Sequence, residues 1–553
     1  MAHPIMMKAA RAVQAKLLRN SIKNAAEWAL TYRIIGGKKW TFARHPWLYE
    51  PHTYMGPEGH AMKAAQIGFT EYLMNLTFML IDILGESVLY ALPDGDSAKD
   101  FSAGRFDPAL QENKILRALF SDTKNVGMKR AGIATLYVRG ARSRSKLKSI
   151  PTAGVIMDEI DEWLRAAIDL ALERSSGQLE KWIRSISTPS IAGHGVHRLF
   201  EDTTQSEFMF KCKKCNQYEM LTFDPNDEAA SSLIISTDDP TSPELYKTHL
   251  RCKKTNLILP HEEKLDWLAL ERTKYIPKYQ DRITPGWHCG QLYSHTVAPW
   301  ELAKVYLSAL GNPGSVQEFW NNKMGMVHTE EGCAVTIEDL QGCQSNHQMG
   351  PHVGDNLVTM GIDVGSKYIH VEINAWYQKN TAQSHDINES SVARLLLATK
   401  VTEWSELDYL MSQYNVNYAV VDAGPEYRPA RDFCNRWYGK SRRCFFAQGG
   451  GKVDISAPED GDIVTVNRTM WLDQALSRFK ESRKTIALPI DTPMEYKDNI
   501  RALVRSYKRN EQSGEMTARY VSGSADHYGF SRLFSEVALA LVAGKGVNRD
   551  IQE

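Results

Sequence analysis

Residues 62–78 place a glycine turn directly before a helix-like run, an arrangement that can bind phosphate. Such a loop needs backbone N–H groups at a tight turn, a helix N-terminus facing the phosphates, a lysine, and a hydroxyl for Mg²⁺. Gly68 supplies the turn and Thr70 the hydroxyl. Because Phe69 occupies the usual lysine position, we expect Lys63 to reach back across the loop. A purely structural turn before a helix is the alternative.

Two consecutive acids, Asp158 and Glu159, follow a second apolar run. This is the form of a Walker B site, in which the aspartate holds the water shell of Mg²⁺ and the glutamate polarises the attacking water. Solvation of a loop is the alternative. A short strand then ends at Thr188, which completes the order of an ASCE-type ATPase. In that order Thr188 would sense the γ-phosphate and couple its loss to movement, although a plain strand terminator explains it equally well.

Residues 139–148 lie between these motifs and contain five basic residues and no acid. They predict either an arginine finger for the γ-phosphate or a contact with the DNA backbone, and a solvated charged loop is the alternative. The finger candidates are Arg139, Arg142 and Arg144, which the sequence does not distinguish.

Three aspartates stand out in the C-terminal third: Asp363 in GIDVG, Asp422 in VVDAG and Asp526 in SADHYGF. The first two end apolar strands and the third begins a helix. Acids that converge in this way can hold two divalent metal ions about 4 Å apart and cleave a phosphodiester. Hard oxygen ligands favour Mg²⁺ or Mn²⁺. Asp526 could instead simply cap its helix. Glu372 and Glu426 are spare acids that could as easily be surface residues. His527 could be a proton shuttle, with a solvated histidine in the first turn of the helix as the alternative.

Three of the eight cysteines are clustered, Cys212 and Cys215 in CKKC and Cys252 in RCKKT. Two such knuckles would bind Zn²⁺ through four thiolates, but Thr255 stands where the fourth cysteine is expected. His249, Cys289 or His288 could supply the fourth ligand, and the spacing does not select one of them. The sequence therefore predicts either a zinc site or a knuckle-shaped element that has lost its metal. The small number of cysteines favours a reducing cytoplasm.

The elements around these residues alternate between apolar strands and helix-like stretches, which predicts an α/β fold with a mostly parallel sheet covered on both faces. Residues 357–365, 367–377 and 417–424 predict three further strands before a final helix-like run. We predict an N-terminal segment and P-loop (ASCE-type) ATPase core over residues 1–204, and a knuckle-containing subdomain with a helical region over 205–330. A polar linker over 331–356 and an RNase H-like nuclease domain over 357–553 would complete the chain.

The overall charge is balanced, with 66 Lys and Arg against 66 Asp and Glu, so only local patches could attract DNA. The longest apolar stretch, residues 72–84, is interrupted by polar residues and is too short to span a bilayer. The first 20 residues lack the apolar core of a secretory signal. We therefore expect no membrane association.

The loop KxxQxGFT, the DEID motif and the triplet of aspartates together resemble the large terminase subunits of tailed double-stranded DNA phages, the lambda-like branch most closely. Residues 27–51, the segment LPDGDSAKDFSAGRFDP, the two knuckles and the FWNNKMG block resemble that branch as well. The resemblance covers roughly residues 25–545.

This resemblance implies a DNA-packaging motor: an ATPase that pumps double-stranded DNA through the portal into the procapsid, and an endonuclease that cuts the concatemer. It implies a small terminase subunit and the portal as partners, a homo-oligomeric ring during packaging, and action in the host cytoplasm without retention in the mature virion. It assigns the ATP site to Lys63, Gln66, Gly68, Thr70 and Asp158, catalysis to Glu159, and nuclease metals to Asp363, Asp422 and Asp526. Trp47 would stack near the adenine.

Two alternatives remain at this point. A helicase or repair ATPase with a nuclease would share both sites, but ordinarily needs a second ATPase core, which the sequence does not show. A non-catalytic DNA-binding or portal-associated structural protein would explain why Phe69 and Thr255 replace expected residues.

Overall fold

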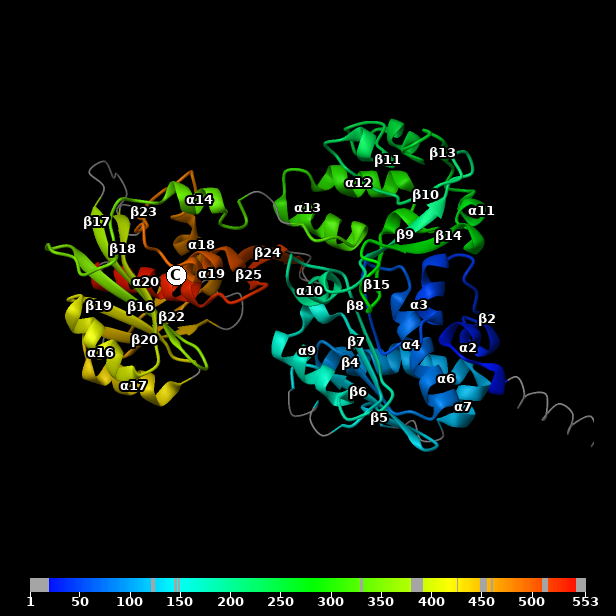
Figure 1. The fold of residues 1–553 in the computed structure, drawn as a ribbon, viewed down its shortest axis with the longest axis horizontal. Helices are drawn as coiled ribbons and strands as arrows, with labels where there is room; N and C mark the ends of the chain where they lie inside the picture. The colour runs from blue at the N-terminus through cyan, green and yellow to red at the C-terminus, as the bar shows by residue number, and fades with distance from the viewer. Residues whose placement is uncertain are drawn as a thin grey trace, which may run out of the picture. The chain divides into compact units, whose positions relative to one another are not determined.

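The computed structural model describes residues 19–120, 125–143, 147, 150–328, 332–378, 391–424, 426–447, 455–458, 461–509 and 516–543. The chain divides into two compact units, Met1–His328 and Thr329–Glu553 (Figure 1). Within the described residues, no helix combines the length and apolarity that crossing a bilayer requires.

The first unit is built on a ten-stranded sheet. In sheet order its strands are β10 (Tyr218–Glu219), β9 (Ser206–Lys211), β15 (Gly286–Cys289), β3 (Glu58–Lys63), β8 (Trp182–Ser187), β7 (Gly154–Asp158), β4 (Val88–Leu92), β6 (Ala134–Gly140) and β5 (Met128–Ala131), while β14 (Thr273–Pro277) pairs with β9. The strands from β9 to β6 run parallel, and β5, β10 and β14 are antiparallel to their neighbours. The predicted mostly parallel sheet is confirmed, with β8 between β3 and β7.

Helices cover both faces of this sheet, so the central strands β8, β7 and β4 are buried along their whole length rather than on one face only. Leu89 and Val155 pack on one face with Ile168 of α9, whereas Tyr90 and Leu76 belong to a larger core on the other face. The helices are α2 (Ala25–Tyr32), α3 (Tyr49–Thr53), α4 (Phe69–Met79), α5 (Gly95–Phe101), α6 (Asp107–Glu112), α7 (Lys114–Leu119), α9 (Arg165–Leu172), α10 (Gly195–Glu201), α11 (Lys264–Trp267), α12 (Pro299–Ala309) and α13 (Pro313–Phe319).

Residues 205–330 contribute directly to this sheet. Strands β9, β10, β14 and β15 extend it beyond β3, and β15 pairs in parallel with β3 from Gly286↔His60 to Cys289↔Lys63. The sequence sets this region apart as a subdomain. Its strand β15 nevertheless pairs with one edge of β3, the strand that leads into the glycine turn. Two small sheets accompany it, β1 (Ile34–Ile35) with β2 (Lys38–Lys39), and β11 (Leu233–Ile234), β12 (His249–Arg251) and β13 (Ile258–Leu259).

The second unit contains an eight-stranded sheet in the order β21 (Ile455–Ser456), β22 (Ile463–Val466), β20 (Ser441–Phe446), β19 (Tyr418–Asp422), β16 (Leu357–Val364), β17 (Ile369–Gln378), β18 (Ser391–Val401) and β23 (Ile486–Ala487). Antiparallel β16–β17–β18 continue into parallel β16–β19–β20–β22. One face packs on α16 (Trp404–Gln413) and α17 (Tyr427–Arg436), and the other on α18 (Arg468–Ser477), α19 (Met494–Ala502) and α20 (His527–Ala543). A hairpin of β24 (Leu503–Arg509) and β25 (Met516–Ser522) stands apart from this sheet.

The segment 331–356, for which the sequence predicts a linker, forms part of this second unit over its described residues. It contains α14 (Ile337–Gly342), which begins with a capping box at Thr336. Val335, Leu340 and Cys343 are buried in the same core as α18 and α20. The segment looks like a linker in sequence because its few apolar residues are separated by many polar ones.

Helix α20 lies unusually close to β16 because of Gly361. A Cβ atom at this position would meet the backbone oxygen of Ser531 at 1.9 Å and the backbone nitrogen of Ser535 at 2.4 Å. Only glycine allows this approach, which brings the start of α20 beside the end of β16.

Candidate functional site

The glycine turn has the geometry of an anion-binding loop. It follows Lys63 at the end of β3, passes through left-handed conformations at Gln66 (φ 57°) and Gly68 (φ 87°), and ends where α4 begins at Phe69. Because the first N–H groups of a helix have no acceptor within the helix, those of Phe69 and Thr70 are free of intrahelical bonds. The positive end of the helix dipole adds to this attraction for an anion.

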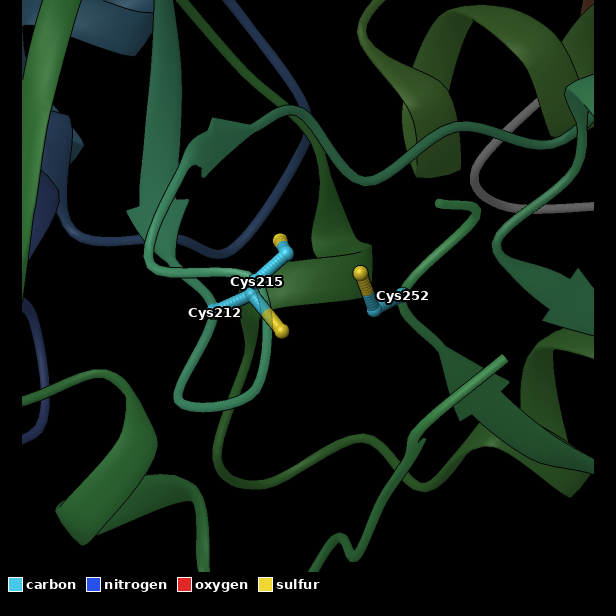
Figure 2. A group of neighbouring side chains, drawn as sticks. All are labelled: Cys212, Cys215 and Cys252. Atoms are coloured by element: carbon cyan, nitrogen blue, oxygen red, sulfur yellow. The ribbon is translucent and has the colours of Figure 1, made fainter. Parts of the chain in front are cut away.

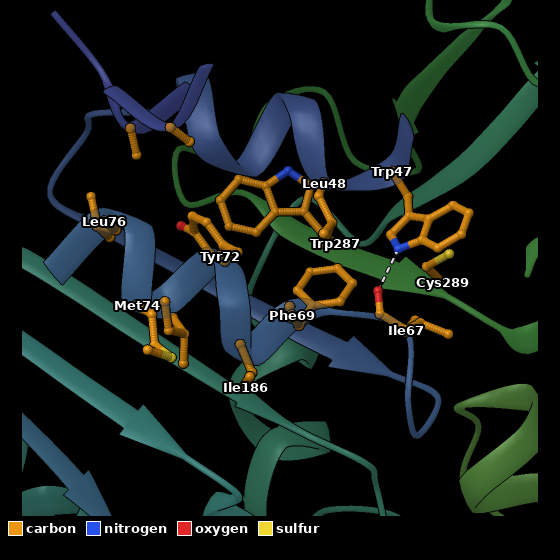
Figure 3. Packing of buried hydrophobic residues seen from close by; sticks show 14 of the residues in the cluster. Trp47, Leu48, Ile67, Phe69, Tyr72, Met74, Leu76, Ile186, Trp287 and Cys289 are labelled. Atoms are coloured by element: carbon orange, nitrogen blue, oxygen red, sulfur yellow. Dashed lines mark hydrogen bonds between the residues drawn. The ribbon is translucent and has the colours of Figure 1, made fainter. Parts of the chain in front are cut away.

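The loop is held in shape by residues from distant parts of the chain. The indole of Trp47 donates to the carbonyl of Ile67 at 2.8 Å (Figure 3). The N–H of Ala65 donates to the carbonyl of Asn322 at 2.8 Å, and the Gln291 side chain donates to the carbonyl of Ala65 at 2.7 Å. These bonds fix the backbone without a ligand, so the loop is preorganised for binding.

Gly325 supports the same loop from the FWNNKMG block. Its φ is +68°, and a Cβ there would lie 2.6 Å from the nitrogen of Ala64 and 2.8 Å from the carbonyl carbon of Lys63. This block therefore supports the glycine turn although it lies about 260 residues further along the chain.

The acid of β7 lies opposite the loop. Asp158 is buried at the end of the strand, accepts a hydrogen bond from the Tyr90 hydroxyl at 2.8 Å, and its Oδ1 has no hydrogen-bond partner in the structure. Burial raises the pKa of the Asp158 carboxyl, while Lys63, Tyr90 and Thr70 act to lower it. A buried carboxylate oxygen without a donor suits a cation ligand.

Lys63 and Glu159 complete this group. Burial lowers the pKa of the Lys63 ammonium, and the neighbouring carboxylates of Asp158 and Glu159 oppose that shift. Glu159 is exposed and has φ 54°, a left-handed conformation that is uncommon outside glycine. Such strain is concentrated at functional sites, and here it turns the backbone immediately after the strand.

Asp161, a residue that the sequence analysis did not select, connects this site to the end of β8. Its carboxylate accepts from the backbone N–H of Ser190 at 2.9 Å and from that of Val196 at 2.8 Å. Its own N–H donates to the Ser187 hydroxyl at 3.3 Å. Thr188 lies half-buried between these contacts, directly after β8. Its place in the DEID motif was the only sequence signal for Asp161.

In the second unit, Asp363 and Asp422 end the neighbouring parallel strands β16 and β19. Burial raises the pKa of Asp422 to about 6, the Gly424 N–H lowers it, and the charge of Asp363 raises it further. Burial also raises the pKa of Asp526, with a further contribution from Asp363. The structure therefore places Asp363 within electrostatic reach of both Asp422 and Asp526, and the guanidinium of Arg468 lies near Asp363 and Asp526.

Two histidines lie closest to Asp363. His527 Nδ1 is 2.7 Å from Asp363 Oδ2, and the rings of His370 and His527 stack with centroids 4.4 Å apart. The ligand atoms of Asp363, His370 and His527 all lie within 4.8 Å of one another, whereas the three aspartates do not form such a group among the described residues. The sequence indicated His370 only weakly, through the alternating pattern of β17. It indicated His527 only through its position next to Asp526.

The start of α20 is positioned by charged residues that are buried deep in the unit. Arg532 donates to Glu372 at 2.8 Å and also pairs with Glu536, while Arg478 donates to Glu536 at 2.9 Å. All four side chains are inaccessible to solvent. Glu372, left as a surface candidate by the sequence, is therefore part of a buried ion network. Breaking such a network leaves an uncompensated buried charge, so the network defines how α20 packs.

Comparison with known families supplies the identity. The model of the phage terminase large subunit gpA ATPase domain matches residues 37–273. The model of the gpA endonuclease domain matches residues 284–522, so the two together cover most of the chain. The chain belongs to the family of phage large terminase subunits.

The terminase shares its fold with the large terminase of bacteriophage HK97, at 9% identity and a TM-score of 0.50, over 93% of this chain and 98% of that one. The large terminase nuclease of the thermophilic phage G20c is 13% identical over 37% of this chain and 98% of that one, with a TM-score of 0.23. No curated protein matches the chain.

Family membership settles what the terminase does. It is an ATPase and a DNA endonuclease, and it works as a phage DNA-packaging motor that cuts concatemeric DNA. The α/β fold of an ATPase domain followed by a nuclease domain, predicted from the sequence, is confirmed. The helicase and structural-protein alternatives are not supported.

Trp47, which the resemblance places near the adenine, is buried against the glycine turn of the terminase. Trp47 is 1% exposed and packs beneath the loop, with its ring against His45 and His295, so it presents no free face for an adenine (Figure 3). The sequence could not show this, because the adenine position was inferred from resemblance alone.

The arginine-finger candidates differ in their surroundings. Arg139 donates to the carbonyls of Gly127 and Val138, which directs its guanidinium toward the β5–β6 hairpin. Arg142 is exposed beside Asp94. Arg144 lies outside the described residues.

Proposed function

We propose that this terminase binds and hydrolyses ATP with Lys63, Gln66, Gly68, Thr70, Asp158 and Glu159. The observation that carries this proposal is the environment of Asp158, whose unpartnered oxygen lies in a buried site beside Lys63. The N–H groups at the start of α4 would bind phosphate oxygens, and Lys63 would neutralise their charge. Thr70 and Asp158 would hold Mg²⁺, which supplies further positive charge when bound. Glu159 would accept the proton of the attacking water.

Thr188 is proposed to couple the nucleotide site to movement, because it lies between Ser187 and Ser190, which both contact Asp161. A change at the γ-phosphate that shifts Asp161 would be transmitted to the segment after β8 that contains Thr188. Arg142 remains a finger candidate because its side chain is exposed, whereas Arg139 is engaged by backbone carbonyls.

For DNA cleavage, we propose that Asp363, Asp422 and Asp526 hold Mg²⁺ or Mn²⁺, which activate water and stabilise the leaving oxygen when bound. Their carboxylates are hard ligands of the type these ions prefer. His527 would orient Asp363 through the 2.7 Å contact with its Oδ2. Zn²⁺ at Cys212, Cys215 and Cys252 is a separate proposal that depends on neither reaction.

The family further supports the proposal that the protein acts in the host cytoplasm on double-stranded DNA, with a small terminase subunit and the portal as partners. A homo-oligomeric ring on the procapsid during packaging, and absence from the mature virion, belong to the same proposal.

The nucleotide site is tested by ATP hydrolysis of the full-length protein. Lys63→Ala and Glu159→Gln should each reduce the rate by about 10²-fold or more, because a general base alone contributes about 10²–10⁴-fold. Lys99→Ala is the matched control, since Lys99 only forms an exposed pair with Asp96. Wild-type rates in both site variants would disprove the assignment.

The nuclease site is tested by nicking of supercoiled plasmid in Mg²⁺ and in Mn²⁺. Asp363→Ala should abolish nicking and also weaken metal binding measured by calorimetry. Asp355→Ala, at an exposed position before β16, is the control. If Asp363→Ala keeps both nicking and metal affinity, the three aspartates do not form the metal site.

A further inference from the structure

Three cysteines from two separate turns converge in the first unit. Cys212 and Cys215 lie in the turn after β9, and Cys252 lies in the turn after β12 (Figure 2). Their sulfur atoms are all within 4.8 Å of one another, and none of the three forms a disulfide. Three soft sulfur ligands at this separation are typical of a zinc site.

The two turns have the same backbone structure. The carbonyl of Cys212 accepts from the N–H of Asn216 at 2.9 Å, and that of Cys252 accepts from the N–H of Asn256 at 2.8 Å. Both asparagines are left-handed, with φ of 57° and 55°. Thr255 therefore occupies the position in the second turn that Cys215 occupies in the first.

Side chains hold the two turns face to face in a reciprocal way. Lys214 of the first turn donates to the carbonyl of Thr255 at 3.5 Å. Lys254 of the second turn donates to the side-chain oxygen of Gln217 at 2.6 Å. The Thr255 hydroxyl lies 3.9 Å from the sulfur of Cys212. The face of the cysteine cluster where a fourth sulfur would lie is thus occupied by this hydroxyl.

Polar groups surround the sulfurs. The backbone N–H groups of Cys215 and Lys214 contact the sulfur of Cys212. Glu219 is buried, accepts from the Cys252 thiol at 2.8 Å, and is fixed by the N–H of Lys253 at 2.9 Å. Glu219 is therefore placed to take the Cys252 thiol proton when a metal ion binds.

We propose that Cys212, Cys215 and Cys252 bind one Zn²⁺ as thiolates, and that water takes the fourth position beside the Thr255 hydroxyl. Binding releases the three thiol protons to solvent, that of Cys252 by way of Glu219, which accepts its hydrogen bond before the metal binds. The ion links the end of β9, in the main sheet, to the β11–β12–β13 sheet. It therefore fastens these two sheets to each other, with the water completing four-coordination.

The test begins with the metal content of full-length protein purified under reducing conditions with zinc in the medium. One Zn²⁺ per chain is expected, and Cys212→Ser or Cys252→Ser should lose it. Cys434→Ser, a buried cysteine of the second unit, should keep it. A wild-type chain without zinc, or zinc retained in both serine variants, would overturn the proposal, as would a disulfide within the cluster in the purified protein.

Replacement by Co²⁺ tests the open position without relying on variants that could misfold. The thiolate-to-cobalt absorption should correspond to three sulfurs in the wild type and to four in Thr255→Cys, with slower loss of the metal to a chelator. Thr255→Val should retain one metal ion. A four-thiolate spectrum in the wild type, an unchanged spectrum in Thr255→Cys, or loss of metal in Thr255→Val would each refute the open fourth position.

Discussion

Asp158 is bound on one side only. Its Oδ2 accepts from Tyr90, whose ring also stacks on Phe101 with centroids 4.9 Å apart, and its Oδ1 has no hydrogen-bond partner in the structure. Tyr90 thereby fixes the carboxylate rotamer, so that the remaining oxygen is directed to the site rather than to the core.

Tyr90→Phe tests this positioning role. The ring and its stacking remain, but one buried carboxylate oxygen loses its donor, which typically costs about 1–3 kcal/mol of stability. We expect a lower melting temperature and a reduced ATP hydrolysis rate, with the Mg²⁺ concentration for half-maximal rate increased. An unchanged Mg²⁺ dependence together with normal stability would show that Tyr90 does not position Asp158.

The Asp422 pKa of about 6 predicts a pH dependence of stability in metal-free protein. Because the folded state binds this proton more tightly than the unfolded state does, the free energy of unfolding should fall as the pH rises from about 4 through 6. Urea unfolding in chelator at pH 5 and pH 7 measures this. Asp422→Asn should show a smaller decrease, since its own contribution is lost while the other buried carboxyls, such as Asp363 and Asp526, still contribute. An identical decrease in the variant would contradict the assignment.

Each site lies where a strand ends and a helix begins. Lys63 and Asp158 end strands separated by β8, and Asp363 and Asp422 end adjacent strands. The carboxyl ends of parallel strands meet at one edge of the sheet, so the motifs of each unit are brought together by strand order. In the second unit, the third acid arrives only because α20 packs tightly on β16.

Gly361→Ala should disrupt that packing. The added methyl would overlap the backbone of α20, which cannot move as a side chain could. Overpacking typically costs about 1–3 kcal/mol, and a backbone clash lies at or above the upper end. Urea unfolding of the second unit and loss of plasmid nicking measure the effect. Gly350→Ala is the control, because its Cβ would meet nothing within 4 Å, and equal stability of the two variants would be inconsistent with the close helix approach.

At the scale of the whole molecule, the two sites belong to units with separate hydrophobic cores. The hydrophobic clusters of the first unit contain no residue of the second unit, and those of the second unit contain no residue of the first. ATP hydrolysis and DNA cleavage can therefore be removed one at a time.

We predict two unfolding transitions in calorimetry of the full-length protein, because each core can melt independently. Gly361→Ala should lower the midpoint of only one transition and leave ATP hydrolysis near the wild-type rate. A single transition that shifts as a whole would mean that the two units unfold cooperatively.

The residue types and their spacing were sufficient to predict the glycine turn and the alternation of strands and helices, and to propose the acids of the two sites. Local sequence determines these features, because turn residues and apolar periodicity act over a few positions. The same local view misjudged residues 331–356, whose sparse apolar side chains are buried only by contact with distant helices.

The sequence by itself thus determined which groups are available for chemistry and which segments form strands. The tertiary structure decided their neighbours: Trp47 beneath the loop, Asp161 between two strand ends, and His370 beside His527. These contacts join residues far apart in the chain, so they depend on strand order and helix packing, which no local pattern contains.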